Sequence, residues 1–171
     1  MKSIKQIDIQ YYKTKVGELI LGSFNGNLCM VDYRDREKRK TIDHRVVKGL
    51  GAEFREQDSA VLVKTRDQLN EYFRGYRKVF EISLLMVGTD FQRQVWEALL
   101  KVPYGTTVSY LQLAKDIGNE KAVRAVANAN GANAIGIIIP CHRIIGSNGY
   151  LGGYAGGVLA KKRLLKLEKS L

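Results

Sequence analysis

Cysteine and histidine are scarce in this chain, which holds only two of each among its 171 residues. Cys29 and Cys141 lie far apart, so they supply neither the framework of a disulfide-stapled protein nor the paired thiols of a zinc site. His44 and His142 are the only imidazole ligands, and we therefore expect no bound metal. Isolated free thiols are typical of a reducing compartment, which predicts a cytoplasmic location.

Long apolar runs are also missing. No apolar stretch approaches the roughly 18 residues of a membrane span, and residues 1–10 lack the apolar segment of a secretory signal. We therefore expect no membrane partner and a soluble protein. Because 45% of the residues are hydrophobic, the chain can bury a substantial core and fold unaided.

Acidic residues are few in the second half of the chain. Residues 88–171 carry 11 Lys and Arg but only 5 Asp and Glu, which is +6 of the total net charge of +11. Cations with few interspersed acids are the usual footprint of a surface that meets phosphate. A basic surface that only keeps the protein soluble fits the same charge. The C-terminal half is thus the better candidate for nucleic-acid binding, and charge alone leaves both interpretations open.

The first third of the chain predicts a small antiparallel sheet. Runs rich in apolar and β-branched residues predict strands, with a turn rich in Asn and Gly before the last one. The predicted strands cover residues 7–11, 18–21 and 28–31, and the turn covers residues 25–27. Cys29 falls within the last strand, where a free thiol behaves as a small buried hydrophobe.

The region that follows predicts one helix and a closing strand. Residues 34–40 are dense in alternating charge, which predicts a solvated loop or strand end, to which we assign no function. Apolar spacing predicts a helix over residues 59–74, with Gly75 as its stop. A strand over residues 79–82 then completes a predicted N-terminal domain of residues 1–83.

After residue 88 the pattern becomes helical. Thr89 and Ser109 are each followed three residues later by Gln, the capping-box signature of a helix start. The first of these helices must end before Pro103. The second ends at a turn over residues 118–119, and residues 120–130 predict another helix. Two short helices around a tight glycine-containing turn are typical of a helix-turn-helix, although other helical hairpins share this pattern.

The expected fold class is therefore α+β. A small N-terminal sheet-containing domain precedes a mainly helical C-terminal domain over residues 89–171, with a winged helix-turn-helix-like DNA-binding motif. Within the latter, residues 135–139 predict a buried extended segment that brings Cys141 to a fixed place. A long loop with six glycines between residues 146 and 157 and a final helix over residues 158–170 follow.

Cys141 is the candidate nucleophile. A free thiol has a pKa of about 8.5, so only a small fraction is thiolate at neutral pH unless a base or a positive charge helps. His142 follows it directly, and from an extended segment it would reach the thiol through a turn or a bridging water. The tetrapeptide over residues 140–143 alone favours a buried cysteine beside a capping histidine. The apolar segment before it and the glycine-rich loop after it favour an anchored nucleophile instead.

The sequence around this thiol resembles a known active-site signature. The run Ile139-Pro140-Cys141-His142-Arg143-Ile144-Ile145 is similar to that of the O6-alkylguanine-DNA alkyltransferases, also called methylated-DNA-protein-cysteine methyltransferases. Further similar stretches stand in family order and spacing at residues 103–106, 109–114, 122–126, 133, 152–157 and 164–168. The N-terminal part resembles the family's small sheet-containing domain only loosely.

The resemblance implies DNA repair by a suicide reaction. Cys141 would take an alkyl group from guanine O6 and keep it, so that one protein molecule repairs one lesion. A soft thiolate suits attack on a saturated carbon, and the resulting thioether has no easy route back. No cofactor is required. The implied partner is double-stranded DNA with alkylated bases, bound by a monomer, and O4-alkylthymine is a second substrate that the sequence leaves open.

The resemblance also implies roles for other residues. His142 would act as the base with Glu168 orienting it, and Tyr110 would supply a proton or hydrogen bond to the leaving guanine. Arg124 would fill the place of a base flipped out of the duplex. The small side chains around it would let the helix enter the minor groove. The implied DNA-facing residues are Ala122, Val123, Ala125 and Ala127, and the implied pocket residues are Asn133, Tyr154 and Ala155.

This sequence departs from the family pattern at two points, and simpler interpretations compete at others. Many relatives carry Ser or Arg where this chain has Ala155, so only a backbone N–H could serve there, and the metal ligands of human-type relatives have no counterpart. Without the resemblance, Glu168 would be an exposed glutamate paired with a lysine such as Lys161, and Tyr110 would be a core aromatic. The alanines also fit plain helix propensity.

Two other functions remain possible from the sequence. An alkyltransferase-like damage sensor shares the fold and lacks the nucleophile, which Cys141 argues against. A cysteine hydrolase or a thiol-based redox regulator on a DNA-binding domain is the second alternative. A hydrolase would turn over repeatedly, and a redox regulator would need neither Tyr110 nor Arg124.

Overall fold

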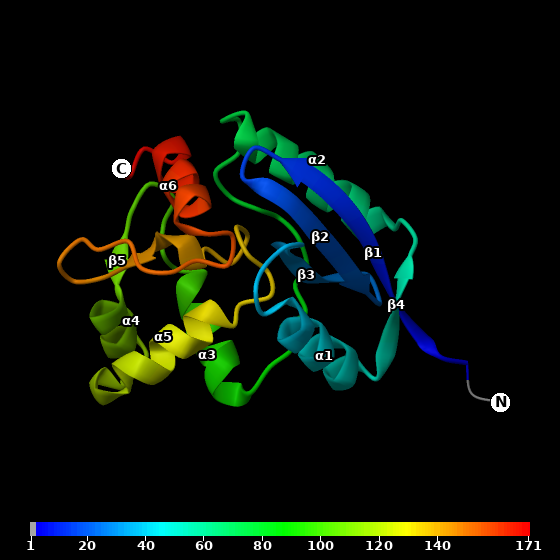
Figure 1. Ribbon diagram of the computed structural model, residues 1–171, viewed down its shortest axis with the longest axis horizontal. Helices are drawn as coiled ribbons and strands as arrows, with labels where there is room; N and C mark the ends of the chain where they lie inside the picture. The colour runs from blue at the N-terminus through cyan, green and yellow to red at the C-terminus, as the bar shows by residue number, and fades with distance from the viewer. Residues whose placement is uncertain (1–2) are drawn as a thin grey trace.

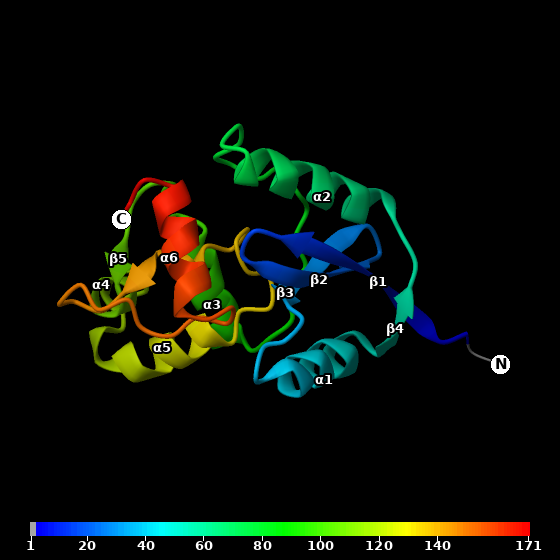
Figure 2. The same cartoon turned by 45° about the horizontal axis from the view of Figure 1, so that its top comes forward.

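The structure, a computed structural model, describes residues 3–171. Its N-terminal part is a four-stranded sheet with the strand order β3-β2-β1-β4. Strands β1 (Lys5–Thr14), β2 (Gly17–Phe24) and β3 (Asn27–Tyr33) are antiparallel, and β4 (Ala52–Glu56) pairs in parallel with β1. Helix α1 (Arg39–Leu50) connects β3 to β4, and α2 (Ala60–Phe73) follows β4. The two helices lie on opposite sides of the sheet (Figures 1 and 2).

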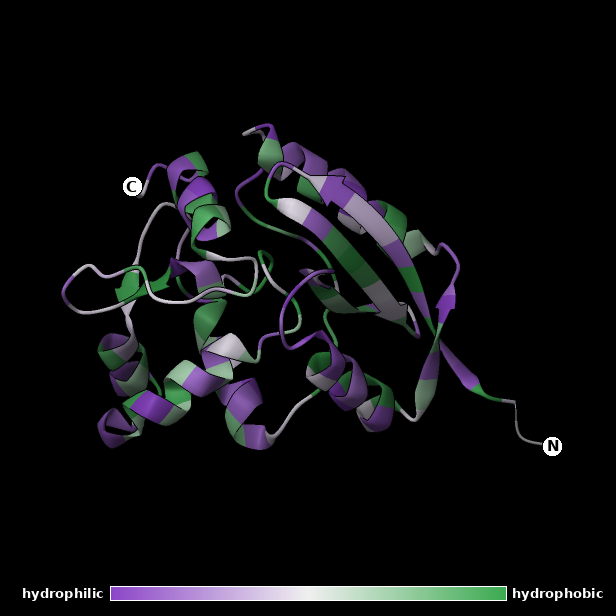
Figure 3. Ribbon diagram, in the orientation of Figure 1, coloured by the Kyte–Doolittle hydropathy of each residue, from purple (hydrophilic) through white to green (hydrophobic). Residues whose placement is uncertain are grey.

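The central strand β2 is buried on both faces because a helix covers each one. Leu19 and Leu21 belong to the hydrophobic cluster that contains Leu62 of α2. Ile20, which points the other way, belongs to the cluster that contains Ile42 of α1. Figure 3 shows the concentration of apolar residues along β2. The N-terminal part is thus a sheet between two helices.

Several N-terminal predictions are confirmed. The three predicted strands form β1, β2 and β3, and Asn25 and Gly26 adopt φ values of 50° and 78°, the left-handed pair of a tight hairpin turn. Helix α2 starts after Ser59, whose hydroxyl accepts a hydrogen bond from the N–H of Leu62. Gly75 follows the helix with a φ of 81°, which favours glycine.

The prediction for residues 34–40 is wrong in part, because α1 begins at Arg39. The charges of this segment are paired internally as well as solvated: Arg36 and Arg39 lie 3.1 Å and 3.0 Å from the buried carboxylate of Asp32. Helix α1 and strand β4 were not predicted at all. The helix buries only Ile42 and Val46, which is too narrow an apolar stripe to give a periodic signal.

The predicted strand over residues 79–82 is also wrong, since these residues have no regular secondary structure. Their backbone is held by a side chain of α2 instead. The N–H of Glu81 donates to Oε1 of Gln68 at 2.9 Å, and Nε2 of Gln68 donates to the carbonyl of Glu81 at 3.3 Å. A side-chain amide thus replaces the neighbouring strand as hydrogen-bond partner.

The C-terminal part is mainly helical. It contains the α-helices α3 (Asp90–Leu99), α4 (Tyr110–Asp116), α5 (Val123–Gly131) and α6 (Val158–Leu167). Strand β5 (Val108–Ser109), before α4, pairs in parallel with β6 (Ile144–Ile145), which lies between α5 and α6. Single 3-10 turns precede α5 and β6: η1 (Glu120–Ala122) and η2 (Cys141–Arg143). Thr89 caps α3 with a complete capping box, and Ser109 caps α4. The predicted α+β fold with a helix-turn-helix-like pair, α4 and α5, is confirmed.

The segment before Cys141 is buried as predicted, but it is not extended. Ile135 makes a single bridge with Val31 of β3, and the chain then turns tightly. The N–H of Ile139 donates to the carbonyl of Ile135 at 2.9 Å, and Ile137 adopts a left-handed φ of 69°. The pairing with β3 ends after this bridge, and buried backbone groups still need hydrogen-bond partners. The apolar run therefore satisfies them within a turn.

The edge of β3 joins the two parts of the molecule. The N–H of Val31 donates to the carbonyl of Ala134 at 2.8 Å, and the N–H of Gly136 donates back to Val31 at 2.7 Å. One hydrophobic cluster contains residues of β2, α2, α3, α5 and α6. The predicted division into residues 1–83 and 89–171 stays a prediction. Among residues 3–171, no helix has both the length and the apolar character needed to cross a membrane.

Candidate active site

Cys141 is the first residue of η2, and only 5% of it is exposed. Burial raises the pKa of its thiol above the usual value, while a hydrogen bond with Asn133 and the nearby charges of Lys161 and Arg36 oppose this effect only in part. The resting sulfur is therefore a thiol. A base has to take its proton before the sulfur can attack.

Two asparagines fix the turn that carries Cys141. The side-chain oxygen of Asn133 accepts from the N–H of Ile135 at 2.9 Å, and its amide nitrogen donates to the carbonyl of Ile139 at 2.9 Å. The amide of Asn130, in α5, donates to the carbonyl of Cys141 at 3.5 Å. The end of α5 and Cys141 are thus held together through side-chain to backbone hydrogen bonds.

His142 is completely buried beside Glu168. Its Nε2 lies 2.8 Å from Oε2 of Glu168, and within residues 3–171 its Nδ1 has no hydrogen-bond partner. Burial lowers the pKa of His142 below its usual value, although the Glu168 carboxylate opposes this effect. The imidazole is therefore neutral at pH 7. Since Nε2–H donates to the carboxylate, Nδ1 carries the free lone pair.

Glu168 follows α6 and is 2% exposed. Oε1 accepts from Nε of Arg143 at 2.8 Å, and Oε2 accepts from Nη2 of Arg143 at 3.1 Å. The phenol of Tyr72, in α2, donates to Oε2 at 2.5 Å. Burial alone would raise the pKa of this carboxyl. The hydrogen bonds from His142, Arg143 and Tyr72 outweigh burial and lower the pKa from 4.5 to about 2.

Lys161 is a second buried charge near the site. It is fully buried, and its ammonium donates to the carbonyl of Ile144 at 2.6 Å and to the carbonyl of Leu151. Burial lowers the pKa of Lys161 to about 8. Lys161 therefore does not pair with Glu168, and it ties α6 to β6 and to the glycine-rich loop.

A cavity of 780 Å³ opens at Cys141. Tyr110, Asn133, Tyr154 and Ala155, all expected at the site, lie on its wall. Residues of α5, of α1 and of the segment before α1 complete the lining, including Ala127, Asn128, Arg36 and Arg45. The volume lies within the range of about 300–1,000 Å³ that is typical of small-molecule pockets.

Two tyrosines of the cavity keep their phenol protons at neutral pH. Burial, and then the nearby Cys141 sulfur, raises the pKa of Tyr110 above its usual value. Burial raises that of Tyr154 further, and the hydroxyl of Tyr154 lies 2.9 Å from the hydroxyl of Tyr33 in β3. Gly152 passes so close to Tyr110 that a Cβ there would lie 3.0 Å from the phenol oxygen. The absence of a side chain at Gly152 therefore lets the glycine-rich loop lie against Tyr110.

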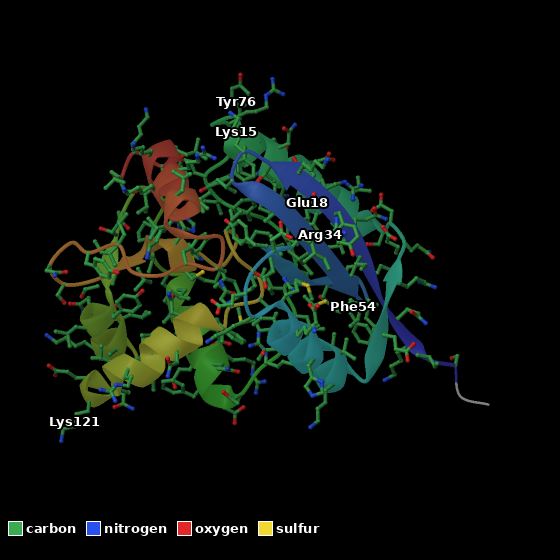
Figure 4. All side chains as sticks on the ribbon, in the orientation of Figure 1. Lys15, Glu18, Arg34, Phe54, Tyr76 and Lys121 are labelled. Carbon is green, nitrogen blue, oxygen red and sulfur yellow. The ribbon has the colours of Figure 1, made fainter. Side chains whose placement is uncertain are left out.

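Helix α5 turns one face away from the core. Arg124 and Ala125 are exposed, whereas Val126 and Ala129 are buried. The other three residues expected at the DNA, which are half-buried, are Ala122, Val123 and Ala127. The predicted continuous helix over residues 120–130 is instead η1 followed by α5, with Ala122 outside α-helical geometry. Figure 4 shows Lys121 of η1 at the outer edge of the molecule.

The structure brings together Cys141, Tyr110 and the three pocket residues, and it places His142 against Glu168. The roles assigned to these residues stay predictions, as do the DNA contacts of α5. Sequence reasoning assigned no role to Tyr72 or Arg143, and it named Lys161 only as the partner of an exposed Glu168. The position of Arg143 directly after His142 was an available signal. In residues 3–171, no three His, Cys, Asp or Glu side chains are grouped so as to hold a metal ion.

Two family profiles match the chain. One, described as "6-O-methylguanine DNA methyltransferase, DNA binding domain", matches residues 90–170. The other, described as "6-O-methylguanine DNA methyltransferase, ribonuclease-like domain", matches residues 8–86.

Several curated relatives share the name methylated-DNA-protein-cysteine methyltransferase. The protein from Methanosarcina barkeri is 52% identical over 158 residues, which cover 92% of this chain and 94% of the relative. The protein from Mycobacterium tuberculosis is 56% identical over 104 residues, which cover 61% of this chain and 63% of the relative. The match to the mycobacterial protein thus spans less than two thirds of its length.

Solved structures of proteins with the same kind of name are also similar to this chain. The crystal structure of the Mycobacterium tuberculosis O6-methylguanine methyltransferase has a TM-score of 0.81 and 39% sequence identity, covering 96% of this chain and 93% of its own. The same values hold for the structure of Mycobacterium tuberculosis OGT in complex with DNA. An archaeal relative from Pyrococcus kodakaraensis, at 24% identity and a TM-score of 0.66, shares the fold.

Proposed function

Since the chain belongs to the family of methylated-DNA-protein-cysteine methyltransferases, we propose that it repairs DNA by moving an alkyl group from guanine O6 to Sγ of Cys141. The observation that carries this proposal is the buried thiol on the wall of a 780 Å³ cavity, next to a histidine held by a carboxylate. The names of the relatives support the class of reaction.

The transfer is a single displacement at the alkyl carbon. The bond from Sγ to carbon forms while the bond from carbon to O6 breaks, and the electron pair of the broken bond stays with guanine. His142 takes the thiol proton on Nδ1 through a bridging water, because Glu168 holds the opposite nitrogen. The charge of Glu168 stabilises the imidazolium that forms.

The departing guanine needs a proton, and Tyr110 supplies it. Its phenol lies on the cavity wall and keeps its proton at neutral pH. Solvent then carries the proton from His142 back to Tyr110. The step balances without a redox partner, so we propose that no cofactor takes part. The thioether on Cys141 offers no comparable leaving group, which makes the transfer irreversible and limits each molecule to one lesion.

The damaged base has to leave the duplex, because a stacked base cannot reach a thiol that is 5% exposed. We propose that the exposed face of α5 enters the minor groove, where Arg124 takes the place of the flipped base. The complex of Mycobacterium tuberculosis OGT with DNA supports DNA as the partner. O4-alkylthymine carries the same kind of exocyclic alkyl oxygen and is a second substrate to test.

Intact-protein mass spectrometry tests the reaction. The protein is incubated with duplex oligonucleotides that contain O6-methylguanine or, separately, O4-methylthymine. We expect one stable methyl adduct per molecule, which peptide mapping places on Cys141. The adduct should be absent in Cys141→Ser and unchanged in Cys29→Ser, because Cys29 is buried in β3 and is not among the residues that line the cavity.

The other outcomes correspond to the alternative functions. Tight binding of the lesion with no gain of mass would indicate a damage sensor. Repeated turnover, with product in excess of protein, would indicate a hydrolytic thiol enzyme. Reversible oxidation of Cys141 without any adduct would indicate a redox regulator.

A further inference from the structure

Tyr72 is a buried titratable residue that the reaction above does not use. It lies in α2, in the N-terminal part, and none of its surface is exposed. Its hydroxyl nevertheless donates to Oε2 of Glu168 at 2.5 Å, across 96 residues of sequence. Helix α2, which is not expected to contact DNA, thus contributes a hydrogen bond to the network of Glu168 and His142.

Oε2 of Glu168 is crowded. It lies within hydrogen-bond distance of Nε2 of His142 at 2.8 Å, the Tyr72 hydroxyl at 2.5 Å and Nη2 of Arg143 at 3.1 Å. A carboxylate oxygen has about two lone-pair sites, so three donors compete for it. Any donor that draws on this oxygen weakens the attraction between Glu168 and a proton on His142.

We propose that Tyr72 is a positioning residue of the alkyl-transfer reaction, whose phenol fixes Glu168 and limits how strongly this carboxylate holds the proton on His142. The inference rests on the proposed function. Its consequence is that the N-terminal part completes the catalytic unit, so that the unit formed by His142 and Glu168 depends on the docking of α2.

The surroundings of Tyr72 keep it in this role. Its ring packs against Phe73, Phe80 and Tyr104 with ring-centroid distances of 5.3, 5.4 and 6.3 Å. Burial, and then the charge of Glu168, raises the pKa of Tyr72 far above its usual value. The phenol therefore keeps its proton near neutral pH and donates it to Glu168.

Other charged and titratable groups also face His142. Arg143 beside it and Lys161 of α6 both oppose its protonation, whereas Glu168 favours it. Tyr154 contributes a ring 6.4 Å away, and Cys141 precedes it in the chain. Removing the hydroxyl of Tyr72 deletes none of these groups, and the comparison with Tyr104→Phe separates the loss of this hydrogen bond from repacking of the aromatic cluster.

The test compares Tyr72→Phe with Tyr104→Phe. Tyr104 belongs to the same aromatic cluster, but its hydroxyl donates to the backbone carbonyl of Leu167 at 3.3 Å and not to Glu168. The chain has two histidines, and His44 is exposed. All proteins therefore carry His44→Gln, so that the imidazole of His142 is the one followed by NMR. We expect Tyr72→Phe to raise the pKa of His142 by about half a unit or more, and Tyr104→Phe to leave it in place.

The rate of alkyl transfer gives a second readout. A protonated His142 cannot take the thiol proton, so the acid limb of the pH-rate profile should move to higher pH in Tyr72→Phe by the same amount as the NMR titration. Site-specific fluorotyrosine at position 72 reverses the sign, because a more acidic phenol is a stronger donor. It should lower the pKa of His142, which keeps the test decisive even where Tyr72→Phe fails to fold.

If wild-type protein gains its alkyl adduct but the pKa of His142 is the same in both Tyr72 variants as in wild type, the proposed role of Tyr72 is overturned. A rate that falls equally at every pH would also overturn it, because that pattern indicates packing alone. Wild-type protein that gains no adduct would instead overturn the proposed function, whatever the imidazole titration shows.

Discussion

At the scale of single residues, Glu168 concentrates the electrostatics of the site. It is buried and accepts hydrogen bonds from His142, Arg143 and Tyr72, which together lower its pKa from 4.5 to about 2. A carboxyl whose pKa is depressed in the folded state stabilises the fold above its unfolded pKa. That stabilisation disappears as the pH falls through the folded pKa. A difference of this size corresponds to about 3 kcal/mol.

Glu168→Gln tests this contribution. The substitution keeps the volume and removes the charge, leaving the buried guanidinium of Arg143 without its carboxylate. We expect the free energy of unfolding in urea to fall by about 3 kcal/mol at pH 7. The difference from wild type should shrink between about pH 4.5 and pH 2, since the wild-type carboxyl is then protonated as well. A deficit that is constant over this range would contradict the ionic origin.

The residues that we propose to be catalytic differ in how visible they are in the sequence. Cys141 and His142 are adjacent, and an apolar run and a glycine-rich loop flank them, so the residues themselves point to a nucleophile with a base. Glu168 and Tyr110 could be assigned only through family resemblance. Tyr72 gave no signal, because its hydroxyl meets Glu168 only after α2 and α6 have packed together.

At the scale of elements, the two ends of α5 differ: the first is exposed and the last is bonded to the N-terminal part. Its first turn exposes Arg124, whereas its last carbonyls are capped from the N-terminal part. Nη2 of Arg36 donates to the carbonyl of Gly131 at 2.5 Å, and Nη2 of Arg45 donates to the carbonyl of Ala132 at 2.7 Å. Guanidinium groups at a helix C-terminus satisfy free carbonyls and complement the helix dipole.

Arg124→Ala tests the exposed end of α5. We expect slower repair of O6-methylguanine in duplex DNA and a much smaller loss on the free base, because only the duplex requires a replacement for the flipped nucleotide. The measurement is the rate of adduct formation with each substrate. Lys121→Ala is the matched control: we propose that this exposed cation contacts phosphate, so its removal should weaken duplex binding and reduce the salt dependence without changing the rate at saturating duplex or on the free base. Equal losses on both substrates in Arg124→Ala would remove the proposed flipping role.

Elements with a local start or stop signal could be predicted, and those set by their partners could not. Helices α2, α3 and α4 each have a capping Ser or Thr, and the β2–β3 turn has Asn-Gly. By contrast, α1 starts without a side-chain cap, at residues whose charges pair with Asp32. Residues 79–82 have strand-like composition, yet the backbone N–H and carbonyl of Glu81 pair with the side chain of Gln68. Tertiary contacts decided both cases.

At the scale of the whole molecule, Arg36 joins the two parts. Its guanidinium contacts the buried carboxylate of Asp32 and the carbonyls of Gly131 and Asn133. We expect Arg36→Ala to reduce the free energy of unfolding by about 3 kcal/mol, because it leaves Asp32 buried with fewer partners. The control is Arg34→Ala, whose exposed ion pair with Glu18 should contribute little. Urea titrations in parallel measure both, and similar losses would contradict the role of Arg36 as a tie between the N-terminal and C-terminal parts.

The hydrophobic core also predicts that both parts unfold together. A single apolar cluster runs from β2 and α2 to α3, α5 and α6, and the edge of β3 is hydrogen-bonded to residues 134–136. Trp96, the only tryptophan, is buried in α3 and reports on the C-terminal part through its fluorescence. Cys29 is buried in β3, where burial raises the pKa of its thiol to about 12 and suppresses its reactivity.

Urea unfolding in a Cys141→Ser background compares the two probes, since Cys29 is then the only thiol. At each urea concentration, Trp96 fluorescence and pulse labelling of Cys29 are measured on the same sample. We expect one midpoint for both, because exposing either side chain opens packing that the two parts share. Two separated midpoints would mean that residues 1–83 and 89–171 fold as independent domains. The contact between Tyr72 and Glu168 would then persist only while both domains are folded, and its loss would follow the less stable of the two.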